Sequence, residues 1–295
     1  MPKHTKIAFI GLGVMGFPMA GHLSKAEFSV TVYNRSPAKA ELWQQTYRGE
    51  RQSTPGLAAA GADIVLVCVG NDEDVRSVFY GEEGILAVIQ PGTLVIDHTT
   101  TSADLARELS QAVAELGGQF LDAPVSGGQA GAVNGQLSIM AGGTESAFVA
   151  ALPIFGTYGK GWQLLGPAGS GQLCKMVNQL CIAGILQGLS EGLALALASG
   201  LDIGTVQKVL AGGAAQSWQL ENRALTMARG EYDFGFAIDW MVKDLGYCLD
   251  EAGSKGLALP VAAQVQGFYQ ELQADGQNRC DTSALLSRLV KPSES

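Results

Sequence analysis

The stretch IAFIGLGVMGFPMAGHL, from Ile7 to Leu23, decides the fold of the N-terminal half of the chain. Its first four residues form an apolar run of the length of a buried strand. Three glycines spaced G-x-G-x-x-G follow at once, and the segment from Pro18 to Lys25 then suits a helix. In such a loop the first glycine allows a tight turn, the second leaves the backbone bare, and the third lets helix and strand pack closely.

This strand, loop and helix are together typical of a site for the pyrophosphate of a dinucleotide. The helix N-terminus offers free N–H groups and the positive end of its dipole to the phosphates. The alternative interpretation is a βα turn with a purely structural role. On the binding interpretation, the residues expected at the cofactor are Gly11, Leu12, Gly13, Val14, Met15 and Gly16.

The end of the next strand-like segment, Phe28–Asn34, bears on which dinucleotide binds. A site that prefers NAD usually has Asp or Glu here to bind the ribose 2′-hydroxyl, but this chain has Asn34, Arg35 and Ser36. Arg35 can pair with a 2′-phosphate, and Asn34 and Ser36 can add hydrogen bonds. We therefore expect NADP as cofactor. NAD stays possible if Arg35 is a solvated charge and Asn34 binds the ribose.

Composition restricts the class of protein. The chain has 295 residues, of which 47% are hydrophobic and 16% charged, with a formal net charge of −9. These values exclude a disordered chain, and the length predicts two domains. The acidic balance argues against a nucleic-acid partner, because such binding depends on Lys and Arg at phosphates. It does not exclude small anionic ligands, which respond to the local field.

The order of strand-like and helix-like segments predicts an α/β domain. Apolar strand-like runs at Ala62–Gly70 and Thr93–Thr100 alternate with helical patterns, one of which begins at Ser102 and ends at Gly117. QFLDAPV and LSIMAGG add two further strands. Alternation of this kind predicts a doubly wound, Rossmann-like parallel sheet with helices on both faces.

The pattern changes near Trp162, after which strand signals nearly vanish. Gln172–Ala198 is predicted as one long helix, and helical patterns continue to the C-terminus. We therefore expect a dinucleotide-binding domain at 1–166 and an all-helical domain at 167–295. The run Leu180–Gly200 is apolar enough to resemble a membrane span, but Glu191 and several glycines interrupt it. A buried core helix, with no membrane partner, is the expectation.

The cysteines and the N-terminus suggest the compartment. Five scattered cysteines, with no C-x-x-C pair and no His/Cys cluster, predict buried free thiols and no metal site. The sequence MPKHTK leads directly into a strand, so no signal peptide is expected. A cytoplasmic location follows as an expectation.

Four motifs, in order, resemble those of the β-hydroxyacid dehydrogenase family, which includes 3-hydroxyisobutyrate dehydrogenases and glyoxylate or succinic semialdehyde reductases. They are GLGVMGFPMA, DAPVSGGQAGAVNGQL (Asp122–Leu137), GSGQLCKMVNQ (Gly169–Gln179) and KDLGY (Lys243–Tyr247). The resemblance implies a Rossmann-like domain joined through a long helix to an all-helical domain. It also implies cofactor contacts from Gly70, Asn71, Thr100 and Lys243.

The catalytic motif of this resemblance contains Lys175 and Asn178, which helical spacing places on one face. Lys175 as an ammonium would protonate a substrate carbonyl oxygen during reduction, and as a neutral amine would accept that proton during oxidation. Asn178 would hold the amine and the substrate hydroxyl. The alternative for Lys175 is a solvated or anion-binding charge, although its apolar neighbours disfavour it.

The substrate motif contains Ser126, Gly127 and Gly128, whose backbone N–H groups and hydroxyl suit a carboxylate. An ordinary loop is the alternative. Other polar residues receive simpler interpretations. His98, beside Thr99–Thr101, is expected to line the site without catalysing, and Asp72–Glu73 to be solvated loop charges. Lys243 and Asp244 form either a functional pair or a helix-surface ion pair.

These features predict an NADP-dependent oxidoreductase that transfers hydride between the cofactor and a small hydroxy acid or aldehyde acid. The resemblance suggests substrates of the 3-hydroxyisobutyrate, glyoxylate or succinic semialdehyde type. Two alternatives stay open: an imine reductase of the same architecture, and a non-catalytic NADP-binding scaffold or sensor. The long helix rich in small residues predicts a homodimer or homotetramer.

Overall fold

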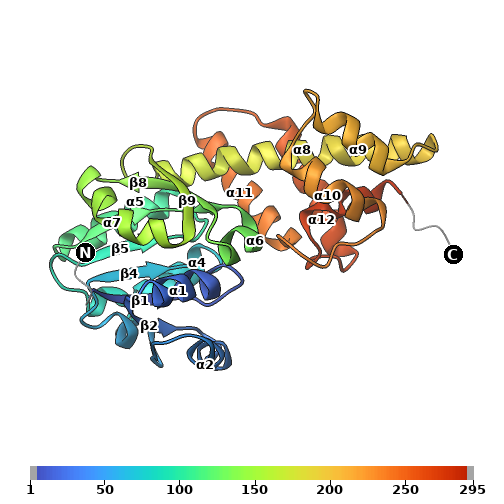
Figure 1. Cartoon of the computed structure of the whole chain (residues 1–295). Helices are drawn as coiled ribbons and strands as arrows, with labels where there is room; N and C mark the ends of the chain where they lie inside the picture. The colour runs from blue at the N-terminus through green and yellow to red at the C-terminus, as the bar shows by residue number, and fades with distance from the viewer. Residues whose placement is uncertain (1–4, 291–295) are drawn as a thin grey trace. The chain divides into compact units, whose positions relative to one another are not determined.

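The computed structural model describes residues 5–290 and divides into two compact units along the chain (Figure 1). The first unit ends at Lys175 and the second begins at Met176, within one helix. The boundary predicted at Gly166 lies between the last strand and that helix. Residues 1–4, on which the expectation about a signal peptide partly rests, lie outside the described part, as do residues 291–295.

The first unit is built on a sheet whose order is β3-β2-β1-β4-β5-β6-β8-β7, with β9 paired to β8. Its strands are β1 (Lys6–Ile10), β2 (Ser29–Tyr33), β3 (Glu50–Arg51), β4 (Ile64–Val67), β5 (Leu94–Asp97), β6 (Gln119–Asp122), β7 (Val125–Ser126), β8 (Leu137–Gly143) and β9 (Gly159–Leu164). From β3 to β6 every pairing is parallel, which confirms the predicted fold class, whereas β8 runs antiparallel to β6.

The strand order reverses at β1, which lies between β2 and β4. In open α/β sheets, ligands bind at such a reversal, beyond the carboxyl ends of the strands. Ile10 of β1 pairs with Val67 of β4, and Val67 pairs with Asp97 of β5. The loops that follow these three strands therefore start side by side at one edge of the sheet.

Helices cover both faces of this sheet. They are α1 (Gly16–Lys25), α2 (Pro37–Thr46), α3 (Pro55–Ala59), α4 (Asp72–Phe79), α5 (Ala103–Glu115), α6 (Gly128–Val133) and α7 (Glu145–Tyr158). Successive residues of β1 belong to different cores: Ile7 and Phe9 to the core under α1, α2 and α7, and Ala8 and Ile10 to the core under α3, α4 and α5. This alternation explains why the strand is apolar throughout.

In the described part of the second unit, up to residue 290, the regular elements are helices joined by loops, and an isolated bridge pairs Ala237 with Asp281. Its helices are the remainder of α8 (Ser170–Ala198), then α9 (Ile203–Ala211), α10 (Trp218–Ala228), α11 (Ile238–Ser254) and α12 (Pro260–Ala274). The predicted long helix and the all-helical second half are thereby confirmed. Two apolar clusters form its core, one of which includes Leu186, Leu245 and Tyr269.

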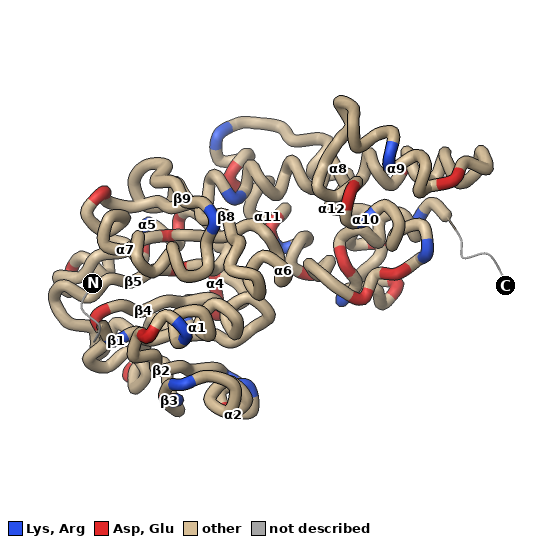
Figure 2. Tube along the Cα trace, viewed as in Figure 1, with Lys and Arg blue, Asp and Glu red and all other residues tan. Residues whose placement is uncertain are grey.

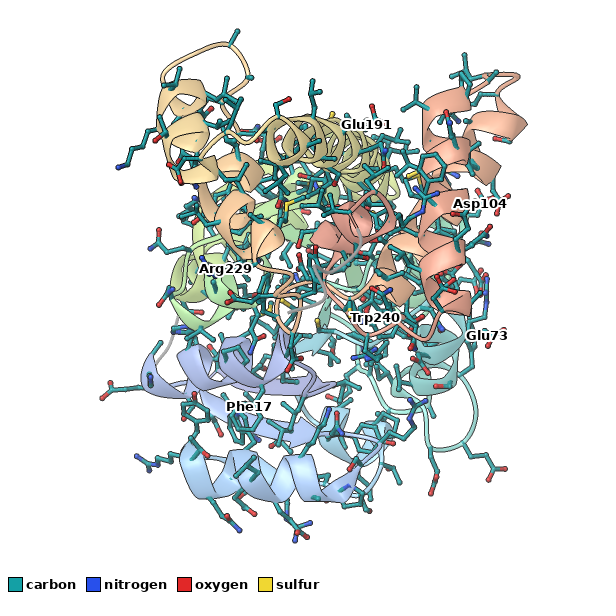
Figure 3. The ribbon with its side chains drawn as sticks, turned by 90° about the vertical axis from the view of Figure 1, so that its right-hand side faces the viewer. Phe17, Glu73, Asp104, Glu191, Arg229 and Trp240 are labelled. Atoms are coloured by element: carbon teal, nitrogen blue, oxygen red, sulfur yellow. The ribbon has the colours of Figure 1, made fainter. Side chains whose placement is uncertain are left out.

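The prediction that the apolar run of α8 is a buried core helix is wrong for this chain by itself. Only 28% of its most apolar window is buried, because one stripe of the helix lies uncovered. By length and composition α8 passes the test for a membrane-spanning helix, and one such helix is weak support for a membrane. Glu191 is exposed on it (Figure 3) and accepts a hydrogen bond from Gln187 Nε2 at 2.7 Å.

The thiols and charges of the described residues are dispersed. All five cysteines are free, but only Cys248 is buried and Cys181 is exposed, so the expectation of buried thiols is met at one position. Cys68, Cys174 and Cys280 are partly buried. In Figure 2, Lys and Arg are scattered along both units in the view shown, with acidic residues between them.

Candidate functional site

The three glycines of the loop after β1 differ in the space around them. Gly11 has a φ of +100°, and a Cβ there would collide with the carbonyl oxygen of Cys68. A Cβ at Gly16 would collide with the carbonyl oxygen of Gly11. At Gly13, by contrast, a Cβ would meet no atom within 4 Å. The first and third glycines therefore serve turn and packing, and the second faces open space in front of α1. This geometry suits a pyrophosphate.

Asn34, at the end of β2, holds this loop in place. Its Oδ1 accepts a hydrogen bond from the Leu12 N–H at 2.8 Å, and its Nδ2 donates to the Ser36 carbonyl oxygen at 3.0 Å. Arg35 points the other way, with 84% of its side chain exposed, and donates to Asp74 Oδ1 at 2.8 Å. The guanidinium therefore lies at the surface beside α4, within reach of solutes.

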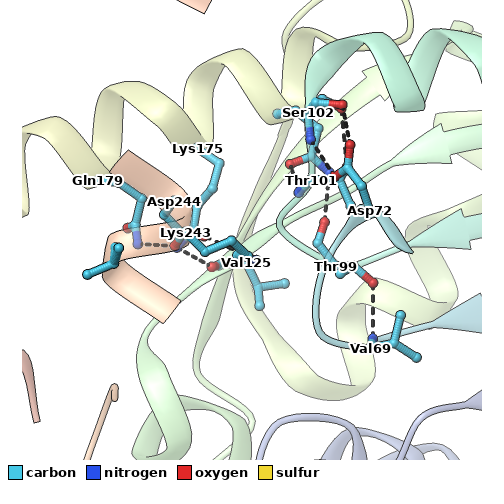
Figure 4. A network of polar contacts seen from close by, with 12 residues as sticks. Val69, Asp72, Thr99, Thr101, Ser102, Val125, Lys175, Gln179, Lys243 and Asp244 are labelled. Atoms are coloured by element: carbon cyan, nitrogen blue, oxygen red, sulfur yellow. Dashed lines mark hydrogen bonds and ion pairs between the residues drawn. The ribbon is translucent and has the colours of Figure 1, made fainter. Parts of the chain in front are cut away.

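The loops after β4 and β5 carry the predicted cofactor residues Gly70, Asn71 and Thr100, and a hydrogen bond joins these two loops. The Val69 N–H donates to Thr99 Oγ1 at 3.0 Å (Figure 4). Asn71 Oδ1 caps α4 by accepting from the Asp74 N–H at 2.8 Å. The glycine loop and these two loops thus start at adjacent strand ends.

Asp72 is not the solvated loop charge that the sequence analysis expected. It lies in the first turn of α4, where its carboxylate accepts from Ser102 N at 3.0 Å and from Ser102 Oγ at 2.6 Å. Glu73 beside it is exposed, as expected, but on the same helix (Figure 3). The sequence interpretation missed α4 because its first turn is acidic and lacks apolar residues, although Asn71 is a recognisable N-cap.

Among the described residues of the first unit, Lys175 is the buried cation, with only 7% of its surface exposed. Its Nζ donates to the Val125 carbonyl oxygen at 2.9 Å (Figure 4). Val125 directly precedes Ser126, and the φ angles of Gly127 (+131°) and Gly128 (+61°) turn the chain into α6. The structure therefore brings the predicted acid–base residue against the predicted substrate loop.

The remaining predicted residues belong to a polar chain in the second unit. Asn178 Nδ2 donates to Gln179 Oε1 at 2.7 Å. Gln179 Nε2 in turn donates to Asp244 Oδ2 at 2.6 Å (Figure 4). Asp244 pairs with Lys243 Nζ at 3.2 Å and is itself buried. The Lys243 ammonium also lies 5.6 Å from the Trp240 ring and 5.4 Å from the Tyr247 ring. This is not a solvated surface ion pair.

His98 does not line a site, contrary to expectation. It is buried, with Nδ1 2.6 Å from the Ala123 carbonyl oxygen and Nε2 2.9 Å from the Tyr158 hydroxyl. Burial lowers the pKa of His98 to about 4, so the ring is neutral at pH 7. Nδ1 therefore donates to the carbonyl oxygen and Nε2 accepts from the tyrosine.

Asp122 and Gln172 are buried polar residues to which the sequence interpretation gave no role. The Asp122 carboxylate accepts from the Gly169 N–H and the Gln172 N–H, at 2.8 and 2.9 Å. The Gln172 amide accepts from the Thr101 N–H at 3.1 Å and donates to the Thr99 carbonyl oxygen at 2.7 Å. An aspartate ending a buried strand was the available signal, but its partners lie 47 and 50 residues away.

Comparison with known proteins extends over both units. Residues 6–176 match the NAD binding domain of 6-phosphogluconate dehydrogenase, and residues 169–289 match the NAD-binding domain of NADP-dependent 3-hydroxyisobutyrate dehydrogenase. An uncharacterized oxidoreductase of Shewanella frigidimarina is 58% identical over 97% of this chain and 99% of its own length.

Two further relatives carry more specific names. The 2-hydroxy-3-oxopropionate reductase of Escherichia coli is 36% identical over 96% of this chain and 97% of its own. A solved structure of 3-hydroxyisobutyrate dehydrogenase from Mycobacterium tuberculosis with L-serine is 30% identical, with a TM-score of 0.88. That match covers 97% of this chain and 99% of the mycobacterial one.

Proposed function

Because this chain belongs to the β-hydroxyacid dehydrogenase family, we propose that it uses NADP(H) to interconvert a small hydroxy acid and its aldehyde acid. Its relatives are oxidoreductases that act on CH–OH groups with a nicotinamide cofactor, and so is this protein. The single observation that supports the proposed chemistry best is the buried Lys175 amine, 2.9 Å from the carbonyl oxygen that precedes Ser126.

The residues after β1 and β2 fit such a cofactor. Open space at Gly13 gives a pyrophosphate access to bare backbone and to the first N–H groups of α1. Arg35 supports NADP over NAD, since its exposed guanidinium suits a 2′-phosphate and no acidic side chain stands at Asn34. Gly70, Asn71 and Thr100 would complete the binding site from the neighbouring loops.

Lys175 moves the proton in this mechanism. The nicotinamide, when bound, supplies or accepts the hydride at the substrate carbon. In reduction Lys175 Nζ donates its proton to the carbonyl oxygen, and in oxidation the neutral amine takes the hydroxyl proton. The Val125 carbonyl oxygen holds one N–H of the amine and so directs the others. Asn178, one turn further along α8, would orient the substrate hydroxyl.

The substrate is proposed to be a short carboxylate. Ser126 and the backbone at Gly127 and Gly128 supply hydrogen-bond donors for that group, and the family names point to 3-hydroxyisobutyrate and 2-hydroxy-3-oxopropionate chemistry. The length and branching of the substrate are to be determined by assay.

A substrate panel with both NADPH and NADH tests this function. We expect NADPH-dependent reduction of at least one short aldehyde acid, for instance glyoxylate, succinic semialdehyde or 2-hydroxy-3-oxopropionate. Lys175→Met should lower kcat by about 10²–10⁴-fold, the usual worth of a positioned proton donor. NADPH binding, followed by fluorescence titration, should stay within a few-fold of wild type because the glycine loop is untouched.

Cyclic imines belong in the same panel. Turnover of imines but not aldehyde acids would identify an imine reductase, and NADPH binding without any turnover would identify a scaffold or sensor. Either result overturns the dehydrogenase proposal, as would full activity in Lys175→Met.

We also propose that the protein is a homodimer or homotetramer that uses the uncovered stripe of α8. Val177, Ile185 and Leu195 repeat at helical spacing with 59%, 41% and 70% of their surfaces exposed, and Cys181 and Gly188 between them are also exposed. An apolar stripe of this length on a soluble enzyme favours burial against a second copy.

A further inference from the structure

We infer that Asp122 and Gln172 are positioning residues for the reaction: they fix the first turns of α8 onto the loops after β6 and β5, and thereby set where the Lys175 amine lies. This inference rests on the proposed role of Lys175 as the acid–base residue. Neither residue touches the reacting atoms in this account, since both act through the helix that carries the lysine.

The Asp122 carboxylate is the anchor on the β6 side. Its Oδ1 accepts from the Gly169 N–H at 2.8 Å and its Oδ2 from the Gln172 N–H at 2.9 Å, so each oxygen binds one N–H at the start of α8. Buried, free N–H groups at a helix N-terminus are costly, and a carboxylate satisfies them with favourable charge. Burial nevertheless raises the pKa of Asp122 to about 6, so the fold accepts an electrostatic cost there.

Two glycines make room for this carboxylate. A Cβ at Gly142 would lie 2.5 Å from Asp122 Oδ1. A Cβ at Gly171 would lie 2.6 Å from the Asp122 carbonyl oxygen and 2.8 Å from Oδ2. The aspartate of the DAPVSGG motif therefore packs closely against Gly142 of β8 and against Gly171 of the G-x-G motif that begins α8.

Gln172 is the anchor on the β5 side. Its buried amide accepts from the Thr101 N–H at 3.1 Å and donates to the Thr99 carbonyl oxygen at 2.7 Å. These two residues flank Thr100, which is predicted to contact the cofactor. The amide group supplies the acceptor and the donor from one side chain.

Lys175 makes a further hydrogen bond between the start of α8 and the β6–β7 segment. It follows Gln172 by one helical turn, and its Nζ donates to the Val125 carbonyl oxygen, three residues beyond Asp122 on the same β6–β7 segment. The segment Asp122–Val125 is thus tied at both ends to the first turns of α8. A shift of the helix start would move the amine relative to both the substrate loop and the Thr100 loop.

A double-mutant cycle tests the inference with Asp122→Asn, which keeps the shape and one acceptor but turns an NH₂ donor toward an N–H group. In the wild-type background we expect kcat to fall on the order of 10–100-fold, the cost of a misplaced catalytic group. The Kd for NADPH should change less than threefold. In the Lys175→Met background the same substitution should lower kcat less than twofold, because the positioned amine is already gone.

Variants of Gln172 provide a second test, which does not depend on whether Asp122→Asn folds. Gln172→Glu keeps the acceptor for Thr101 and loses the donor to Thr99, whereas Gln172→Leu loses both. We expect a graded loss of kcat, larger for leucine, which likewise disappears in the Lys175→Met background. The matched control is Asp202→Asn, because Asp202 caps α9 by accepting from Thr205 N at 2.8 Å and is far along the chain from the motifs. It should leave kcat unchanged.

The outcomes distinguish the positioning role of Asp122 and Gln172 from the acid–base role of Lys175. Equal losses of kcat in the wild-type and Lys175→Met backgrounds would show that Asp122 and Gln172 stabilise the fold or the cofactor site, and would overturn the inference while leaving Lys175 as the acid–base residue. Wild-type activity in Lys175→Met alone would overturn the proposed function, and the inference with it.

Discussion

Arg35 and Asn34 follow one another at the end of β2, yet their side chains serve different partners. Asn34 is used inside the fold, between Leu12 and Ser36, whereas Arg35 extends to the surface and pairs with Asp74. A 2′-phosphate would compete with Asp74 for the same guanidinium. The proposed preference for NADP therefore depends on an ion pair as well as on the arginine.

Substitutions of Arg35 and of Asp74 should shift the affinity for NADPH in opposite directions. Arg35→Ala should raise the KM for NADPH about 10–100-fold, as loss of a hydrogen bond to a charged group does, and leave the KM for NADH nearly unchanged. Asp74→Asn should lower the KM for NADPH, because the guanidinium is released from a competing anion. Steady-state kinetics with both cofactors measures this. Equal effects of Arg35→Ala on NADPH and NADH would contradict a 2′-phosphate contact.

Asp97, at the carboxyl end of β5, makes stability depend on pH. It is buried and accepts from the Thr99 N–H at 2.9 Å, and burial raises the pKa of Asp97 to about 7 from an ordinary value of 3.8. Between these pH values the folded protein holds a proton that the unfolded chain releases. The contribution of Asp97 to stability is thus fully present below pH 4 and is lost as the pH rises through 7.

Asp97→Asn should remove this dependence. Relative to wild type, the variant should gain stability as the pH rises from 4 to 7.5, with a slope of at most about 1.4 kcal/mol per pH unit. Chemical denaturation across that pH range gives the difference in free energy of unfolding. A difference that does not vary with pH would count against a protonated Asp97.

Among the elements, α8 contains glycines of two kinds. Gly171 lies where backbone from β6 and β8 passes close by, and a Cβ there would collide with the Met140 carbonyl oxygen. Gly184 lies in the middle of the same helix, where a Cβ would meet nothing within 4 Å. One glycine is required by packing, and the other only weakens the helix.

Alanine should therefore have opposite effects at these two positions. Gly171→Ala should lower the melting temperature, corresponding to about 1–3 kcal/mol of overpacking, and should lower kcat as well because the start of α8 shifts. Gly184→Ala should raise the melting temperature, by up to about 1 kcal/mol of helix propensity. Thermal unfolding followed by circular dichroism compares them. If Gly171→Ala were as stable as Gly184→Ala, the close packing of α8 against Asp122 would be wrong.

The elements that the sequence predicted share strong local signals. β1, β4 and β5 are continuous apolar runs, and α5 begins at the N-cap Ser102, whose Oγ accepts from the Leu105 N–H. β9 (Gly159–Leu164) was missed because its sequence GKGWQL is polar and glycine-rich, and it becomes a strand only through pairing with β8. Long-range pairing of that kind leaves no local pattern.

The residues of the candidate site likewise divide into those that local motifs predicted and those that they did not. The motifs predicted roles for the glycine loop, Lys175 and Ser126, because each motif is contiguous. They did not identify Asp72 or Asp122 as helix anchors, since Asp72 bonds to a serine 30 residues away and Asp122 to a glycine 47 residues away. Nor did they show that Asn34 faces the loop and Arg35 faces solvent, because side-chain direction depends on how β2 ends.

On the scale of the whole molecule, the uncovered apolar stripe on α8 predicts that copies of the chain associate with one another. Ile185→Glu should dissociate the oligomer, because it places a charge in the middle of the apolar stripe. Light scattering at micromolar concentration should show an oligomer for the wild type and a monomer for this variant. Val149→Glu is the matched control, since Val149 is equally apolar and 57% exposed but lies on α7. A monomeric wild type would refute the proposal.

The compact first unit contains the beginning of α8 as far as Lys175, together with the carboxylate and the amide that hold it. A hybrid enzyme joined in the GPAGSG segment would take that beginning, with Gln172, from one parent, and would take Asp122 and the Thr99–Thr101 loop from the other. A hybrid joined after Lys175 would inherit them together. Exchange of the helical half between related enzymes, as a way to alter what they accept, should therefore succeed only when the seam lies inside the long helix.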